Sequence, residues 1–309
     1  MCRMSPASID SRSSRRIYVE VSFQFILSEA KDLRRHSDPH ATWIRVASAR
    51  RCHRRSFGAS RLRINFNLRL LLTLQYLGTR YAGWQTQANA TGVQQVIERA
   101  FSTMFQSEIR IEGAGRTDSG VHARAQKAHV DVPFEIPERG FLMGLNDLLP
   151  PDIRITDFER VADDFHCRFA AKTKSYVYQV WNGRFADVFT FETHAHVAQR
   201  LDERLMDEAA QSLAGQHDFR AFTVAAPEVS STCRTIATIG AERDGEVIRI
   251  RVSADGFLRY MVRRIAGSLI EVGRGKLDPG ALRRSIEPAF EEARWTAPAK
   301  GLILWDITY

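Results

Sequence analysis

The order strand, helix, strands occurs twice along the chain, and this repetition constrains the fold more than any other feature. Residues 68–76, LRLLLTLQY, form a strand-length apolar run, and apolar residues at helical spacing predict an amphipathic helix over residues 93–105. Thr91 and Gln94 are spaced as in a capping box at the start of that helix. Further expected elements are strands at 109–111 and 128–132, and proline-bearing loops around residues 133, 137 and 150–151.

The second block of the chain repeats this order. A strand is predicted at 175–181, and a helix capped by Asp202 carries apolar residues from Leu205 to Leu213 and ends at Gly215. We then expect strands at 235–242 and 246–252 and a long helix at 257–272. This order predicts an α+β protein of two halves with mainly antiparallel sheets. We place the domains at residues 67–165 and 166–309.

Positive charge is concentrated at the start of the chain. The net charge is +8, yet residues 1–66 hold 14 Lys and Arg against five Asp and Glu, whereas residues 67–309 hold 30 against 31. We interpret residues 1–66, rich in Ser and Arg, as an unstructured extension. It is either a basic arm that gathers RNA or a segment without a role, translated from a start placed too early. Against the second interpretation, no Met lies between Met4 and Met104.

Cysteine and histidine spacing gives no sign of a metal centre. The four cysteines, Cys2, Cys52, Cys167 and Cys233, form no CxxC pair, which argues against zinc and disulfides and favours a reducing cytoplasm. We expect them to be small packing residues. No apolar run reaches the roughly 18 residues of a membrane span. The histidines also lack the spacing of metal ligands: His122, His129, His166, His194 and His196.

The most unusual stretch is residues 113–123, GAGRTDSGVHA, in which three glycines surround an arginine and an aspartate between two apolar strands. Glycine permits a tight turn and close approach of a ligand, so this loop is able to present the carboxylate of Asp118. Residue types alone leave an alternative open, in which Asp118 bonds only the backbone of its own turn.

Residues 115–123, GRTDSGVHA, resemble the signature of the bacterial tRNA pseudouridine synthase A family. The resemblance extends over residues 68–309, where further motifs follow in family order. They are YAGWQ at 81–85 with VQ at 93–94, LN at 145–146 with LP at 149–150, DFHCRF at 164–169, YVY at 176–178, Phe257 with MVR at 261–263, and GLIL at 301–304.

The resemblance implies the pseudouridine synthase fold, with two halves that form a central cleft. It also implies a cofactor-free isomerisation of uridine to pseudouridine in the anticodon stem and loop of tRNA, at tRNA positions 38, 39 and 40. The uracil is detached from its ribose, rotated and rejoined through C5. A homodimer that binds tRNA across both subunits is implied as well, without metal, small-molecule cofactor or membrane.

The same resemblance assigns roles to single residues. Asp118 corresponds to the family's nucleophile, which attacks either the base or the sugar, and Arg263 to the arginine paired with it. A carboxylate in a dry site needs such a partner, because burial alone raises its pKa, by up to about 3 to 5 when the group is fully buried. Arg116 corresponds to a residue inserted at the target base, and Tyr176 to the tyrosine against the uracil. Phe257 and Leu304 correspond to apolar pocket walls.

Alternatives remain for these roles and for the function. Arg263 could occupy a solvated helical face, although Arg264 is available for that, and spacing alone makes Tyr176, Phe257 and Leu304 core residues. The chain departs from the family at residues 123–127, ARAQK, where only Gln126 follows the usual pattern, and it matches poorly at 182–196. A non-catalytic tRNA chaperone of the same fold, or the same chemistry at other uridines, are the alternative functions. The intact set of site residues favours the enzyme.

Overall fold

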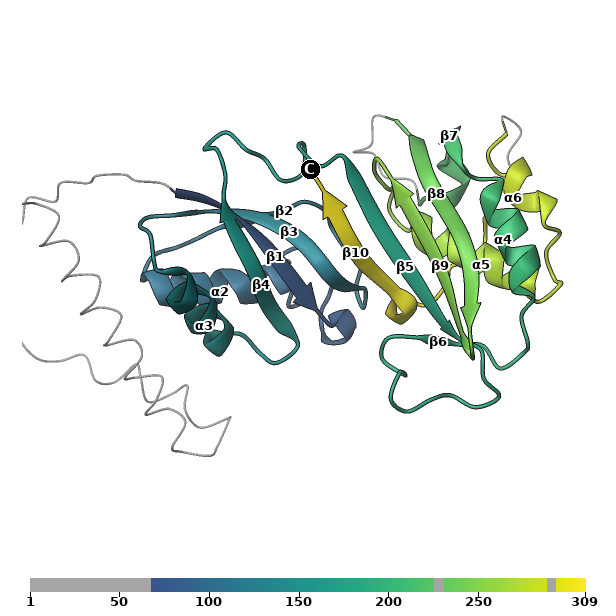
Figure 1. Ribbon diagram of the computed structural model, residues 1–309, viewed down its shortest axis with the longest axis horizontal. Helices are drawn as coiled ribbons and strands as arrows, with labels where there is room; N and C mark the ends of the chain where they lie inside the picture. Colours follow the sequence, from purple (N-terminus) through teal and green to yellow (C-terminus); the bar gives the residue numbers. More distant parts are fainter. Residues whose placement is uncertain (1–67, 225–230, 288–292) are drawn as a thin grey trace, which may run out of the picture.

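The computed structural model describes residues 68–224, 231–287 and 293–309. Within these ranges the chain is an α+β protein whose ten strands join one mainly antiparallel sheet (Figure 1). The order across the sheet is β4-β1-β3-β10-β5-β9-β8-β7, with β2 added to β3 and β6 to β5. Parallel pairs occur at β10–β3 and β5–β6.

The first half contains β1 to β4 with α2 and α3. The bounds of these elements are β1 Leu68–Tyr76, α2 Val93–Phe105, β2 Ile111–Gly113, β3 His122–Val132, α3 Glu138–Leu148 and β4 Ile153–Arg160, with a 3-10 turn at Gly78–Arg80.

The second half contains β5 to β9 with α4 to α6, and the chain ends in β10. The bounds are β5 Thr173–Trp181, β6 Ala195–His196, α4 Glu203–Gln211, β7 Gly215–Asp218, β8 Cys233–Asp244, β9 Val247–Ala254, α5 Met261–Gly273, α6 Gly280–Arg284 and β10 Leu302–Thr308, with 3-10 turns at Arg220–Phe222 and Ala299–Gly301.

Helix α2 confirms the predicted helical pattern, and its apolar residues are buried against the sheet. The capping box is wrong, because Gly92 is the N-cap residue and makes no side-chain cap. Gln94 is used for tertiary contacts instead: its Oε1 accepts from the Thr86 amide at 3.1 Å and its Nε2 donates to the Ile111 carbonyl at 2.9 Å. These bonds connect the start of α2 to β2.

The prolines at residues 133, 137 and 150–151 lie outside helices and strands, as predicted, but helix α3 and strand β4 were not predicted. Pro137 is the N-cap residue of α3, and the helix ends before Pro150. The prolines therefore mark the two ends of a helix. Phe141 of α3 packs edge-on against Phe101 of α2, with ring centroids 5.9 Å apart, so the two helices share one core.

The second half confirms the predicted Asp202 cap: its Oδ1 accepts from the amides of Arg204 and Leu205 at 3.0 and 3.2 Å. Helix α4 ends at Gln211, earlier than predicted, and Gly215 with φ 99° starts β7. Helix α5 begins at Met261 rather than at 257, because Tyr260 at the N-cap has φ 64° and interrupts the helix there.

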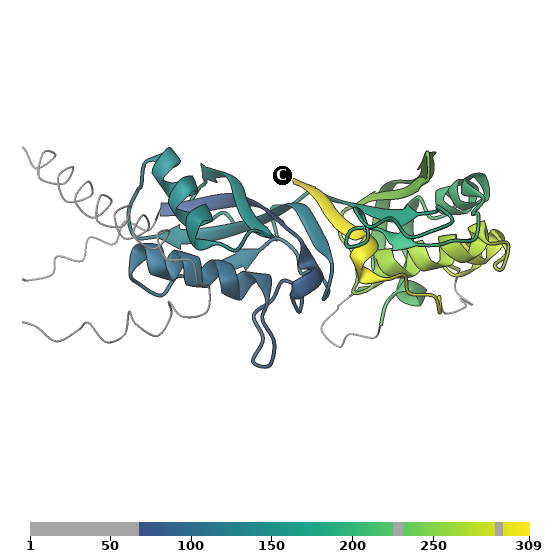
Figure 2. The ribbon, with the colours of Figure 1, turned by 90° about the horizontal axis from the view of Figure 1, so that it is seen from below.

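The predicted separation into two sheets is wrong, because β10 joins the halves into one. Ile303 of β10 pairs in parallel with His122 of β3, and Leu302 pairs antiparallel with Tyr178 of β5. Figure 1 shows β10, in yellow, between β3 and β5, and Figure 2 shows α2 and α5, in blue and yellow-green, on one side of the sheet. The buried side chains of both halves form one hydrophobic cluster.

Three earlier expectations concern other parts of the chain. The interpretation of residues 1–66 as a basic unstructured extension lies outside the described residues, as do Cys2 and Cys52. Cys167 is buried, as a packing residue should be, whereas Cys233 is exposed. In the described part of the chain, every helix is too short or too polar to cross a membrane.

Candidate active site

The loop that carries Asp118 connects β2 to β3 and is fixed by backbone hydrogen bonds. The amide of Trp84 donates to the Thr117 carbonyl at 3.1 Å, and the amide of Gly120 donates to the Tyr81 carbonyl at 3.3 Å. Within the loop, the amide of Val121 donates to the Asp118 carbonyl at 3.1 Å. The segment containing Tyr81 and Trp84 therefore holds the loop on both sides of Asp118.

Gly83 makes this close approach possible. It has φ 93°, and a Cβ placed on it would lie 2.5 Å from the Thr117 carbonyl oxygen. Because L side chains rarely adopt this φ and the space is taken by backbone, only glycine fits at this position without movement of the loop. The YAGWQ motif thus has a direct structural role beneath Asp118.

Three buried or half-buried side chains support the loop from the strands below. The Tyr76 hydroxyl lies 2.9 Å from Thr117 Oγ1, Gln126 Nε2 donates to the Gly115 carbonyl at 2.8 Å, and Lys174 Nζ donates to the Ala114 carbonyl at 2.7 Å. Burial raises the pKa of Tyr76 and lowers the pKa of Lys174. These contacts come from β1, β3 and β5, so both halves hold the loop.

Sequence reasoning noted Gln126 but missed Tyr76 and Lys174. A signal for Lys174 is present in the strand period: it stands two residues before Tyr176, on the same face of β5. Tyr76 is the last residue of an apolar run and carries no distinguishing pattern of its own.

The structure brings Asp118 and Arg263 together from opposite halves of the chain. Arg263 Nη1 lies 3.5 Å from Asp118 Oδ2, with the two side chains 15% and 25% exposed. Arg263 also donates from Nε to the Ala297 carbonyl at 2.9 Å, and its guanidinium lies 5.0 Å from the centre of the Tyr260 ring. Arg263 therefore does not occupy a solvated face.

The neighbouring Arg264 points elsewhere. Its Nη1 donates to the carbonyls of Ala221 and Thr223 at 3.1 and 3.0 Å, which connects α5 to the 3-10 turn at Arg220–Phe222. The two adjacent arginines thus have separate tasks, one at the carboxylate and one in packing the second half.

Apolar side chains lie beside the ion pair. Tyr176 on β5 is buried, and its ring meets that of Phe257 edge-on, with centroids 5.0 Å apart. Leu304 on β10 is opposite Tyr176 in the sheet and is fully buried. Burial raises the pKa of Tyr176, and the nearby Tyr76 and Asp118 raise it further. Tyr176 is therefore a neutral phenol close to the carboxylate.

Arg116 and His122 flank the same loop. Arg116 is exposed, two residues before Asp118. His122 is buried: its Nδ1 accepts from the Gly78 amide at 2.9 Å, and its Nε2 lies 2.9 and 3.0 Å from the carbonyl oxygens of Glu192 and Lys300. The His122 ring thus connects β3 to three other segments, which accounts for its burial without a metal.

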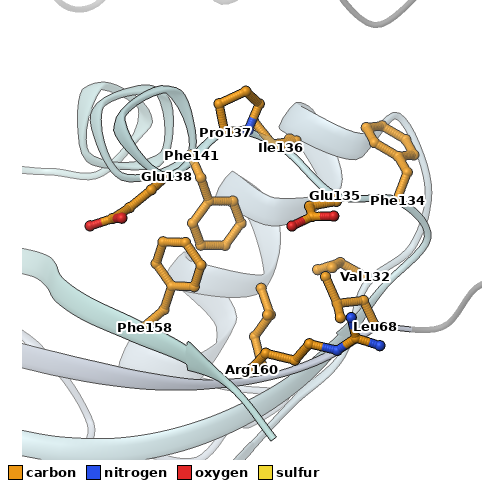
Figure 3. A pocket seen from close by; sticks show the side chains of 11 residues that line it. Leu68, Val132, Phe134, Glu135, Ile136, Pro137, Glu138, Phe141, Phe158 and Arg160 are labelled. Carbon is orange, nitrogen blue, oxygen red and sulfur yellow. The ribbon is translucent and has the colours of Figure 1, made fainter. Parts of the chain in front are cut away.

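A cavity of about 230 Å³ lies well away from these residues. It is lined by residues at the start of β1, the end of β3 and the N-terminal turn of α3, among them Leu68, Val132 and Phe141 (Figure 3). Asp118, in the loop after β2, lies near the other end of the β1–β3 pair, where Tyr76 of β1 pairs with Ala123 of β3. The cavity is therefore separate from the cluster around Asp118.

Comparison with known proteins identifies the family of this chain. The family model for tRNA pseudouridine synthase matches residues 73–170 and 209–309. The tRNA pseudouridine synthase A proteins of Bacillus licheniformis and Bacillus subtilis are 40% and 39% identical over 245 residues, which is 78% of this chain and 99% of each relative. That of Myxococcus xanthus is 39% identical over 244 residues, covering 78% of this chain and 92% of its own length. On this evidence the chain belongs to the tRNA pseudouridine synthase family.

Proposed function

We infer that this protein isomerises uridine to pseudouridine in tRNA. The observation that carries the inference is the Asp118–Arg263 pair, at 3.5 Å, assembled from two halves of a chain in this family. A partly buried carboxylate held beside a guanidinium is able to act as a nucleophile. The aromatic and aliphatic side chains next to it suit a nucleobase.

Asp118 acts as the nucleophile on the bound uridine and attacks either the ribose or the base. The bond from uracil N1 to the ribose breaks, the base turns, and a bond from C5 to the ribose forms. The bond to the Asp118 carboxylate is broken again before the product leaves, the proton on C5 goes to solvent, and N1 gains a proton. Arg263, with Nη1 3.5 Å from Asp118 Oδ2, orients the carboxylate. Tyr176, with Phe257 and Leu304 behind it, offers an apolar, aromatic surface for the uracil, where stacking contributes about 1 to 3 kcal/mol per base.

The target base has to leave its stack to reach Asp118, which costs a few kcal/mol. In this proposal Arg116, which is exposed on the same loop as Asp118, inserts at the vacated position. We propose that the tRNA lies in a central cleft between the two halves, with the anticodon stem and loop near this arginine. The modified uridines are then those at tRNA positions 38, 39 and 40.

Partner and location follow from the same proposal. We propose a homodimer in the cytoplasm, with tRNA as its substrate. RNA affinity depends on local positive charge, because the 30 Lys and Arg of residues 67–309 are offset by 31 Asp and Glu. Arg124, whose guanidinium lies 4.8 Å from the centre of the Trp305 ring, and Lys127 on β3 add positive charge beside the site.

Release of tritium from tRNA labelled at uridine C5 tests the function. Wild-type protein should release it, and Asp118→Asn should lower the rate at least ~1000-fold while tRNA binding persists. Asp157→Asn, at an exposed aspartate of β4, is the matched control and should leave the rate unchanged. Release by neither the wild type nor the variant would indicate a tRNA-binding protein without this activity.

A map of pseudouridines in tRNA from a strain lacking the gene tests the positions. Loss at 38, 39 and 40 alone supports the proposed site, and loss at other uridines would reassign the substrate. Removing residues 1–60 tests the basic-arm interpretation, because an arm that contacts phosphates makes tRNA affinity fall more steeply with salt.

A further inference from the structure

Two of the histidines that looked unrelated in the sequence meet a cysteine in the folded protein. His129 on β3, His166 and Cys167 offer one ligand atom each, and these atoms lie within 4.8 Å of one another. His129 Nδ1 and Cys167 Sγ are 3.2 Å apart. His129 and Cys167 are buried, and His166 is half-buried.

A fourth donor lies at the edge of this group. The Glu112 carboxylate is 3.1 Å from His166 Nε2, and the thiol of Cys167 donates to the Glu112 backbone carbonyl at 3.1 Å. Glu112 is the middle residue of β2, and its side chain is 64% exposed. Two imidazoles, one thiol and one carboxylate are thereby gathered in one place.

The spacing suits an ion in tetrahedral coordination. Zinc bonds of about 2.0 Å to nitrogen and 2.3 Å to sulfur place neighbouring ligand atoms roughly 3.5 Å apart. The observed separations, from 3.2 Å up to 4.8 Å, bracket this value. Side-chain rotation of His166 and Glu112 is enough to close the set, because both are at least partly exposed.

The charges around the group also permit a cation. Arg69 lies near His129, but its Nε and Nη2 each donate to a carboxylate oxygen of Asp131 at 2.8 Å, so its charge is compensated. The Glu112 carboxylate adds a negative charge at the edge of the group, 3.1 Å from His166 Nε2.

We propose that His129, His166 and Cys167 bind a divalent cation of the zinc class, with the Glu112 carboxylate as fourth ligand. On binding, the Cys167 thiol loses its proton to solvent, since thiolate is the form that coordinates. The charges of the cation, the Cys167 thiolate and the Glu112 carboxylate then sum to zero, so the nearby Lys174 ammonium does not face a net positive charge. Whichever ring nitrogen His166 supplies, the hydrogen bond that its Nδ1 accepts from the Arg168 amide is lost, and that amide is exposed to water.

The site would act on the structure and not on the chemistry. It would join the segment of His166 and Cys167 to β2 and β3, and β2 leads directly into the loop of Asp118. Nearby, Tyr309 at the end of β10 already donates to the Cys167 carbonyl at 3.0 Å. A cation here would therefore tie the C-terminal strand, the connection between the halves and the base of the catalytic loop.

Cobalt substitution tests the site on the full chain, stripped of metal with a chelator. Co²⁺ bound to a thiolate gives a charge-transfer band in the near ultraviolet, and zinc should abolish it by displacement. We expect one zinc per chain by elemental analysis, and the band should be lost in Cys167→Ala. Cys233→Ala, which removes an exposed cysteine on β8, is the matched control and should keep the band.

A second variant guards against misfolding of the buried cysteine mutant. His166→Ala removes a half-buried ligand and should lower the affinity for zinc at least ~100-fold. Loss of a residue that only hydrogen-bonds to a ligand already costs up to about 100-fold. It should also abolish the rise in Tm that zinc gives the wild type. A band of equal strength in Cys167→Ala, or unchanged zinc affinity in His166→Ala, would overturn the proposal. Neither readout depends on tRNA modification.

Discussion

The two halves hold the members of the Asp118–Arg263 pair in different ways. Asp118 stands on a loop whose backbone is hydrogen-bonded to the segment of Tyr81 and Trp84, with side chains such as Gln126 beneath it. Arg263 stands in the first turn of α5, and its side chain is directed by the Ala297 carbonyl and the Tyr260 ring. In the first half the backbone sets the geometry, and in the second half side-chain contacts set it.

This difference suits the two groups. The backbone largely determines the position of a short aspartate side chain, so the loop must be fixed. A long arginine side chain needs contacts along its length to be held in place. The pair itself is loose at 3.5 Å. Such contacts are often long without substrate and tighten in the reacting complex. We expect the loop to stay in place and the arginine to make the adjustment when tRNA binds.

The largest effect in the second half should come from Arg263→Gln. It removes the charge beside Asp118, and loss of one such electrostatic partner costs about 100- to 1000-fold in kcat. Arg264→Gln is the neighbouring control: it loses the bonds to the Ala221 and Thr223 carbonyls, so it should lower stability by about 1 to 3 kcal/mol with kcat retained. Single-turnover rates and thermal unfolding separate the two. Equal kcat losses would refute a distinct role for Arg263.

In the first half, a change of backbone should matter more than a change of charge. Gly83→Ala places a Cβ 2.5 Å from the Thr117 carbonyl at φ 93°. The loop has to move, and a shift of 1 Å at a reacting group can cost about 100-fold; we expect a loss of roughly tenfold in kcat from a smaller shift.

Gly245→Ala is the control for backbone strain alone. Gly245 has φ 59° in the β8–β9 turn, with no atom within 4 Å of an added Cβ. It should lose about 1 kcal/mol of stability and no activity. If Gly83→Ala retains full kcat while losing stability like Gly245→Ala, the fixed-loop description of the first half is wrong.

Local patterns were enough to predict part of this structure. The apolar period of α2 and the Asp202 cap of α4 depend on residues close in sequence, and both predictions were confirmed. The joining of the sheets by β10 was missed, because the partner strands of β10 lie more than a hundred residues away along the chain. No local period specifies such pairing.

For the site, too, local patterns predicted one part and not the other. A glycine-rich loop singled out Asp118, but the pairing with Arg263 came only from the family resemblance, since 145 residues separate them. His129 and His166 show that spacing along the chain can also miss a cluster that the fold creates. Spacing along the chain argued against a metal, yet the fold places both histidines with Cys167.

The smallest and most discriminating comparison uses two buried tyrosines. The Tyr76 hydroxyl bonds Thr117 at 2.9 Å, next to Asp118, and the Tyr178 hydroxyl donates to the Pro298 carbonyl at 2.9 Å, next to Ala297. Tyr76→Phe and Tyr178→Phe each remove one bond and should each cost about 1 kcal/mol of stability in denaturant unfolding. They are matched in burial and in the atom removed.

Their effects on kcat should differ if the halves work as described. Tyr76→Phe loosens the residue beside Asp118 and should lower kcat several-fold. Tyr178→Phe should leave kcat near that of the wild type, because both hydrogen bonds between Arg263 and Ala297 remain. Arg263 Nε donates to the Ala297 carbonyl at 2.9 Å, and the Ala297 amide donates to the Arg263 carbonyl at 3.0 Å. Equal losses would mean that the backbone around Ala297 positions Arg263 as strictly as the loop positions Asp118, and the contrast between the halves would disappear.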